Sequence, residues 1–214
     1  MKLTKESLKD KVYNLIKERI FKKEYHLNET LVIARLTEEL QVSNSPIREA
    51  LSHLSSEGLV NFEGSSKYKV VNLSEEKLIE INEAVLILLN GGFETCLEEN
   101  KTELLVQLLD SAYQEHKKIY DNDEEFDYKY IETSLNFDRQ IVVASGNTCL
   151  INLFEYMFPM LVLASVYNKK TYKEKHMEEH SMILQSVKDK DPDRTRELLK
   201  LHFYKDLTSM NFDI

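Results

Sequence analysis

The length of this chain, 214 residues, suffices for two modest domains or one large one, while its formal net charge of −9 argues against a generally basic nucleic-acid-binding protein. The charge is uneven, however. Residues 1–72 hold 12 Lys and Arg against 10 Asp and Glu, whereas residues 73–214 hold 16 against 27. The near-neutral first part can still bind DNA if its few cations face the phosphates.

Composition indicates neither a membrane span nor a disulfide framework. No uninterrupted apolar run approaches the roughly 20 residues of a transmembrane helix, and Met1 to Lys5 are followed by no apolar signal segment. Cys96 and Cys149 lie far apart in the sequence, which favours two free thiols. We therefore expect a soluble, cytoplasmic protein with no membrane partner.

The first 40 residues contain two amphipathic patterns. Residues 9–22 repeat apolar side chains at helical spacing and predict a first helix. Residues 31–40 repeat the pattern more briefly and predict a second helix, with Asn28 or Thr30 as its N-cap.

The stretch 41–60 carries a helix start, an apolar stripe and a helix stop in that order. Ser45 is expected to cap the helix and Pro46 to take its first position, where no N–H is needed. Gly58 ends the run as a C-terminal cap would. Apolar side chains line one face: Ile47, Ala50, Leu51 and Leu54. The other face is polar and carries a guanidinium, which suits an element placed in the major groove of DNA.

Two β-prone runs follow this helix. Residues 59–63 and 67–71 are joined by Gly64-Ser65-Ser66, which predicts a β-hairpin. Three helices followed by a hairpin make a winged helix-turn-helix over residues 1–72.

Arg48 is the first candidate for a contact to DNA, because an Arg side chain reads a guanine edge or holds phosphates. Polar groups at a helix start mostly position the phosphate backbone. Further candidates lie at the start of the same helix, on the hairpin and on the second helix: Ser43, Asn44, Ser45, Lys67, Lys69 and Arg35. For Arg35, a solvated helix face and a DNA contact are equally compatible with the sequence.

The second part, residues 73–214, shows no alternating strand pattern and few glycines or prolines, which predicts an all-helical domain. Helices are expected at roughly 74–99, 101–120, 124–145, 147–168, 170–189 and 192–209. Asn147 and Asp191-Pro192 mark two of the starts. The predicted fold class is mainly α: an N-terminal winged helix-turn-helix and a C-terminal all-α six-helix bundle.

The first helix of this second part is unusual in composition. Its apolar run 84–89 is followed by Asn90, Gly91 and Gly92, and adjacent glycines in a helix cost about 1 kcal/mol each relative to Ala, which predicts a kink or close packing. Another apolar run, 156–163, is expected in the core or on a dimer surface, with a kink at Pro159.

The stretch 41–60 resembles the recognition helix of the GntR family of bacterial transcription regulators. The similarity rests on a family pattern of roughly V-S-R-x-P-V-R-E-A-L-x-x-L-x-x-x-G-L-V, matched here at Val42-Ser43, Pro46 to Leu51, Leu54 and Gly58-Leu59-Val60. The family usually has Arg where this chain has Asn44. Because Asn favours adenine in the major groove, this difference predicts an altered operator.

The second part resembles the FCD ligand-sensing domain of the FadR-like subgroup. The similarity rests on the residues at 135–138, 144–147, 179–180, 191 and 202. In that subgroup an Asp and a His one turn apart and two later His hold a divalent metal, often together with a carboxylate ligand. Carried over by position, these ligands become Ser134, Asp138, His180 and His202. The resemblance thus implies an effector pocket around these four residues, in which one carboxylate and two imidazoles survive.

Two interpretations of this pocket stay open. Asp138, His180 and His202 can bind Zn²⁺ or another first-row divalent metal, as two His and one carboxylate do elsewhere. Alternatively, the two histidines hydrogen-bond Asp138 without a metal. We expect His116 and His176 at the surface. Since relatives usually carry a pocket Arg within the run 84–89, which has none here, we hypothesise an effector less anionic than a dicarboxylate or sugar acid.

These features predict a ligand-responsive, DNA-binding transcription regulator and not an enzyme. We expect a dimeric repressor on a palindromic operator, since half-sites lie about 34 Å apart on DNA. One alternative is a metal-dependent small-molecule enzyme using Asp138, His180 and His202, although a nucleophile and a paired acid and base are not evident. The other is a protein-interaction module that has lost DNA binding, which Asn44 and the low positive charge favour.

Overall fold

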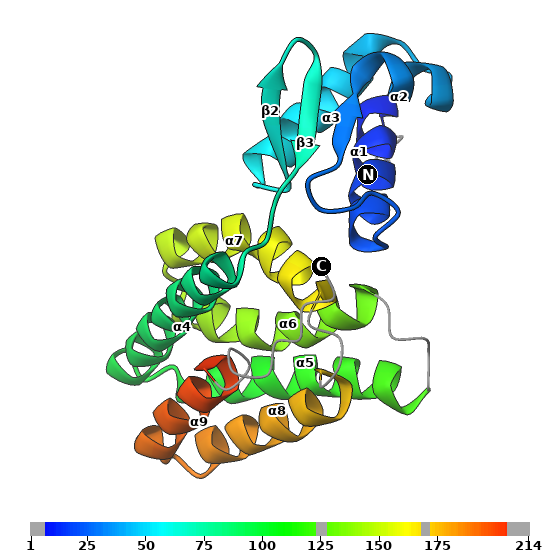
Figure 1. The fold of residues 1–214 in the computed structure, drawn as a ribbon. Helices are drawn as coiled ribbons and strands as arrows, with labels where there is room; N and C mark the ends of the chain where they lie inside the picture. Colours follow the sequence, from blue (N-terminus) through cyan, green and yellow to red (C-terminus); the bar gives the residue numbers. More distant parts are fainter. Residues whose placement is uncertain (1–6, 123–127, 168–171, 205–214) are drawn as a thin grey trace, which may run out of the picture. The chain divides into compact units, whose positions relative to one another are not determined.

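The computed structural model describes residues 7–122, 128–167 and 172–204. The chain divides into two compact units, Met1–Leu73 and Ser74–Ile214. Figure 1 shows strands in the first unit and helices throughout the described part of the second. The mainly α fold class predicted from the sequence is confirmed.

The first unit is a winged helix-turn-helix. Its elements are α1 (Leu8–Phe21), β1 (Thr30–Val32), α2 (Ile33–Leu40), α3 (Asn44–Ser56), β2 (Val60–Gly64) and β3 (Lys67–Val70). The sheet has the order β1-β3-β2 with both pairs antiparallel. Helices α1 and α3 pack on each other, and the apolar face predicted for α3 is buried together with Ile16 and Ile20 of α1.

The strand β1 was not predicted, because the sequence pattern placed a helix from residue 31. Leu31 instead pairs with Tyr68 of β3, and both side chains are buried. Neither expected N-cap is correct: α2 begins after Val32, which makes no side-chain cap, while Asn28 donates a hydrogen bond to Asn72. The local apolar pattern misled because the hairpin that pairs with β1 lies more than 30 residues further along the chain.

Helix α3 begins two residues earlier than predicted. Ser43 is its N-cap residue, so Ser45 and Pro46 lie inside the first turn, and Ser45 donates to Glu49 instead of capping. Pro46 is tolerated there because the first four N–H groups of a helix have no intrahelical partner. The predicted helix end is confirmed: Gly58 has a φ of +76°, the left-handed conformation that suits a C-terminal glycine.

The second unit consists, in its described residues, of six helices. They are α4 (Glu75–Glu98), α5 (Thr102–Asp121), α6 (Tyr128–Ser145), α7 (Thr148–Tyr167), α8 (Tyr172–Lys188) and α9 (Pro192–Tyr204). Both predicted helix starts are confirmed, since Asn147 accepts hydrogen bonds from the N–H groups of Cys149 and Leu150, and Asp191 accepts one from that of Arg194. The predicted extensions to 124, 168, 170 and 209 lie outside the described residues.

Helix α6 packs against α4, α5 and α7 and so forms the centre of the bundle. A Cβ atom added to Gly92 of α4 would lie 3.0 Å from the Cα of Val142 and 3.1 Å from the carbonyl oxygen of Ile141, both on α6. Of the two outcomes predicted for the glycine pair, close packing is therefore the one that occurs at Gly92. At Gly91 the nearest atom would be a side-chain carbon of Leu150, 3.8 Å away.

Helix α7 runs unbroken through Pro159 and is apolar along most of its length. An 18-residue window of this helix has a mean hydropathy of 1.7, so by length and composition the helix could cross a membrane. Of the residues in that window, 44% are buried. Core helices of water-soluble proteins pass the same test, so this is weak evidence for a membrane span. Leu153 and Tyr156 of α7 are large apolar side chains that are exposed.

Candidate functional site

Helix α3 presents a polar face to the solvent. Arg48 is exposed, as are Ser43, Asn44 and Ser45 at the helix start. The Nη2 of Arg48 donates a hydrogen bond of 2.7 Å to the Oγ of Ser66 in the turn between β2 and β3. The side chain therefore lies along the surface that α3 shares with the hairpin, and it is not packed into the core.

The remaining predicted DNA contacts are placed unequally. Lys67 is exposed and directly follows Ser66, the residue that accepts the hydrogen bond of Arg48. Lys69 is half-buried in the middle strand, opposite Thr30 and Asn61. Arg35 is exposed on α2. The α3 start, Arg48 and Lys67 are thus all exposed, whereas Lys69 is set back into the sheet.

Asn44 has a structural contact that sequence patterns did not suggest. Its side-chain amide lies 2.9 Å from the hydroxyl of Thr37 on α2, and this hydroxyl also lies 2.8 Å from the carbonyl oxygen of Ile33. This contact ties the start of α3 to the preceding helix, while the Asn44 side chain stays exposed.

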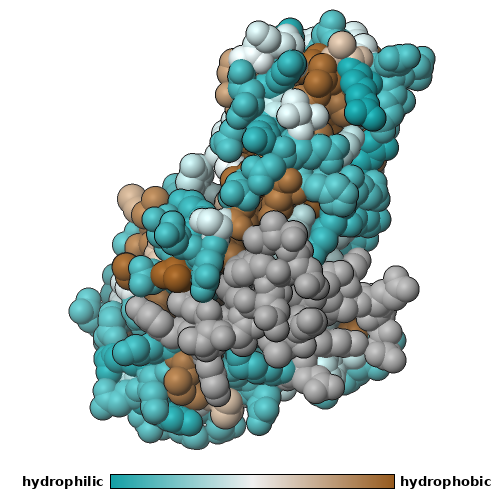
Figure 2. Space-filling model, in the orientation of Figure 1, coloured by the Kyte–Doolittle hydropathy of each residue, from teal (hydrophilic) through white to brown (hydrophobic). Residues whose placement is uncertain are grey.

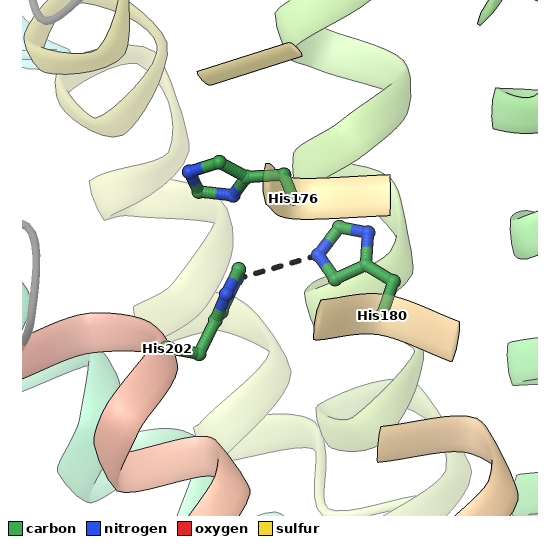
Figure 3. A group of neighbouring side chains, drawn as sticks. All are labelled: His176, His180 and His202. Carbon is green, nitrogen blue, oxygen red and sulfur yellow. Dashed lines mark hydrogen bonds between the residues drawn. The ribbon is translucent and has the colours of Figure 1, made fainter. Parts of the chain in front are cut away.

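The second unit holds a buried cluster of ionisable side chains at the meeting of four helices. Asp138 of α6, His180 of α8 and His116 of α5 are each 0% exposed, while His202 of α9 and His176 of α8 are 3% and 6% exposed. Figure 3 shows the rings of His176, His180 and His202 converging from α8 and α9. Such burial of groups that carry or accept charge is rare unless they are paired or bind a metal.

Three atoms in this cluster form a small triangle. The Nε2 atoms of His180 and His202 lie 3.3 Å apart, and the Oδ1 of Asp138 lies 3.8 Å from the first and 3.6 Å from the second. The Nδ1 of His202 donates to the Oε2 of Glu179 at 2.7 Å. Glu179 thereby orients the ring of His202 so that its Nε2 faces Asp138.

The pKa values in the cluster are set by burial and by Asp138. Burial opposes charge on His202, but attraction to Asp138 and the hydrogen bond to Glu179 outweigh it and raise the pKa of His202 to about 10. Burial dominates at His180 and lowers its pKa to about 4, although Asp138 opposes this shift. Burial would raise the pKa of Asp138, but His202 and His180 lower it below its ordinary value. The carboxylate is therefore ionised in the protein interior.

Several buried polar atoms of the cluster have no hydrogen-bond partner among the described residues. They are both carboxylate oxygens of Asp138, the Oγ of Ser134, the Nδ1 of His180 and both ring nitrogens of His116. Each such atom costs about 1–3 kcal/mol if it stays unsatisfied. In a tetrahedral site with metal–ligand bonds of about 2.1 Å the ligand atoms lie about 3.4 Å apart, close to the edges of the triangle. The donor set and its spacing fit a divalent cation.

The predicted surface positions of His116 and His176 are wrong, because both side chains are buried. His116 packs edge-on against Tyr130, and burial lowers its pKa to about 3. His176 lies one turn before His180 on the same face of α8. The H-x-x-x-H spacing of 176 and 180 was the available signal for a shared inward face. The contact of Glu179 with His202 had no such signal, since 23 residues separate them.

Comparisons with known proteins match both units. The family model described as bacterial regulatory proteins of the gntR family matches residues 8–67, and the FCD domain model matches residues 94–205. An uncharacterised HTH-type transcriptional regulator of Bacillus subtilis, YdhC, is 26% identical over 91% of this chain and 87% of its own. The HTH-type transcriptional repressor GlaR of Escherichia coli is 25% identical over 89% and 90%.

The fold is also found among solved structures. A Listeria monocytogenes protein, Lar, described as controlling the expression of the agr system, superposes with a TM-score of 0.67 over 97% of this chain and 98% of its own. Its sequence is 17% identical to this one, so the likeness is one of fold.

Proposed function

Since the chain belongs to the GntR family of transcription regulators and carries an FCD domain, we propose that it is a homodimeric repressor that binds a palindromic operator and responds to a small molecule. Transcription regulation itself follows from the family. Repression is supported by the naming of GlaR and of the gluconate operon regulator of Bacillus licheniformis as repressors. A regulator of this kind acts in the cytoplasm, where it meets its operator.

The exposed Arg48 is the single observation that most supports operator binding. It projects from α3 beside the hairpin and is held there by Ser66, at a position from which a guanidinium can reach a base edge. We assign Ser43, Asn44 and Ser45 to the same interface, where helix-start groups contact phosphates. Lys67 adds a phosphate contact from the hairpin, Lys69 a weaker one, and Arg35 a contact from α2.

A dimer surface is supported by exposed apolar side chains on α4 and α7, two helices that pack together. Ile87 is 71% exposed, Tyr156 63% and Leu153 53%. Figure 2 shows hydrophobic residues at the surface over α4 and the start of α7. A second copy of this chain is the occupant we propose, because two recognition helices are needed to read half-sites about 34 Å apart.

We place the effector pocket and a divalent first-row metal at the buried cluster. Asp138, His180 and His202 would hold the ion, which when bound supplies a positive centre able to attract a polar or anionic group of the effector. Glu179 orients His202, and Ser134 offers a hydroxyl to the effector. Because residues 84–89 supply no Arg, we expect an effector with fewer anionic groups than a dicarboxylate.

The test uses full-length protein and a library of random DNA duplexes. We expect selection to enrich a palindromic sequence that the protein binds with strong salt dependence. Replacing Arg48 by Ala should weaken binding to the selected duplex about 100-fold or more, since two guanidinium contacts of about 1–3 kcal/mol each are lost per dimer.

The matched control is Arg194→Ala, which removes an exposed Arg from α9 in the other unit. Its affinity for the selected duplex should equal that of the unmodified protein. If selection enriches no sequence and binding is insensitive to Arg48, the chain is instead a protein-interaction module. A sedimentation experiment that finds only monomers would remove the dimeric part of the proposal.

A further inference from the structure

We propose that His176 is a fourth protein ligand of the metal site, completing a set of three imidazoles and one carboxylate. The inference rests on the metal site proposed above. It adds a ligand that is not among the four positions implied by the family resemblance. It assigns to α8 a ligand pair one helical turn apart, His176 and His180.

The position of His176 carries the inference. One ring nitrogen from each of His176, His180 and His202 lies within 4.8 Å of the other two. The rings of His176 and His202 are 4.7 Å apart between centroids and inclined at 73°, so His176 presents an edge and not a stacked face. Figure 3 shows this edge turned toward the space between the other two rings. Asp138 lies outside this 4.8 Å group, so metal binding requires His176 to move toward the carboxylate until the ligand atoms reach the roughly 3.4 Å spacing of a tetrahedral site.

The chemistry of the neighbouring residues explains why a fourth ligand comes from α8. Ser134 precedes Asp138 by one turn on α6, but its neutral hydroxyl is not among the side chains that commonly bind first-row divalent metals. Neutral imidazole from His176 is a strong ligand for Zn²⁺, Ni²⁺ and Fe²⁺.

Charge balance in the interior supports the same set of ligands. A divalent ion held by three neutral imidazoles and the Asp138 carboxylate keeps one net positive charge. The carboxylate of Glu179 is hydrogen-bonded to the Nδ1 of His202 and offsets that charge, although it also lies 3.7 Å from the Nζ of Lys175. Such an offset suits a site whose members other than Glu179 are at most 6% exposed.

The test compares His176→Gln with His116→Gln in the full-length protein. Both substitutions remove a buried His, and the ring of His116 lies 5.8 Å from that of His180, centroid to centroid, close to the site but on α5. Each protein is freed of metal with a chelator, checked for helix content by circular dichroism and titrated with Zn²⁺. Co²⁺ is then added as a spectroscopic probe of ligand number and type.

We expect one tightly bound Zn²⁺ per chain in the unmodified protein and in His116→Gln. In His176→Gln the affinity for Zn²⁺ should fall about 100-fold, because losing a direct ligand costs at least as much as losing a residue that hydrogen-bonds a ligand. The Co²⁺ absorption bands should also shift. Unchanged affinity and an unchanged Co²⁺ spectrum in His176→Gln would show that His176 is not a ligand, while leaving the metal site itself intact. Absence of metal binding by the unmodified protein would overturn both proposals together.

Discussion

The two units place their candidate functional groups in opposite environments. On the winged helix-turn-helix, Arg48 and Lys67 are exposed and supported by a separate apolar core. In the helical unit, Asp138 and His180 are fully buried and form part of the core themselves. The first arrangement lets binding residues change without disturbing the fold, whereas the second couples ligand binding directly to stability.

The two sites also differ in how far apart their residues lie in the sequence. The DNA-binding candidates come from a continuous part of the chain, residues 35–69. The buried cluster gathers residues from α5, α6, α8 and α9, between His116 and His202. An ion or effector bound at the cluster therefore ties together helices that are distant in sequence, which gives it the means to alter the whole helical unit.

The largest expected difference between the two units is their change in stability when metal binds. Raising free Zn²⁺ to about 1,000 times its dissociation constant should stabilise the helical unit by about 4 kcal/mol, because the ion binds the folded site and not the unfolded chain. Hydrogen exchange followed by mass spectrometry, with and without metal, measures this for each unit. Slower exchange in α6, α8 and α9 is expected, with α1 to β3 unchanged. An equal response in both units would show that metal binding does not act selectively on the helical unit.

Asp138→Asn should show the coupling without any metal. In chelator-treated protein the substitution leaves the buried, positively charged His202 without its main partner, and we expect the free energy of unfolding to fall by about 3 kcal/mol. Urea denaturation measures the change. Arg48→Ala, at an exposed position, should alter stability by less than about 0.5 kcal/mol. Similar losses for both variants would remove the distinction between the two sites.

Gly92→Ala should destabilise the helical unit by about 1–3 kcal/mol, since the new Cβ would press on the α6 backbone at Val142 and Ile141. Gly91→Ala is the matched control on the same helix. It meets only Leu150 at an ordinary contact distance, so the better helix propensity of Ala should make it neutral or stabilising by up to about 1 kcal/mol. Thermal unfolding of both variants decides whether the α4–α6 approach is as close as described.

Lys67→Ala should have the smallest effect, and only on DNA binding. We expect weaker affinity on all sequences and a salt-dependence slope smaller by about 1 for each protomer. Lys69→Ala, at the half-buried strand position, should change the slope less. Fluorescence anisotropy of labelled duplex across a range of salt concentrations measures both. A larger change for Lys69 than for Lys67 would mean that the hairpin meets DNA by its strand face and not by its turn.

Sequence periodicity was most informative where structure is local. The apolar face of α3, its stop at Gly58 and the caps at Asn147 and Asp191 were all predicted from neighbouring residues. Prediction was wrong where a distant partner decides the outcome: β1 exists because Leu31 pairs with Tyr68 of the hairpin, and a helical pattern cannot report that pairing.

For the functional sites, the sequence named the candidates: Arg48 from its residue type on the polar face of a helix, and Asp138, His180 and His202 from the family resemblance. The tertiary structure alone decided which of them meet. It placed Arg48 against Ser66, brought Glu179 to His202, and turned His116 and His176 inward. The physical reason is that helix periodicity fixes which residues share a face, whereas only the packing of α5, α6, α8 and α9 fixes what that face touches.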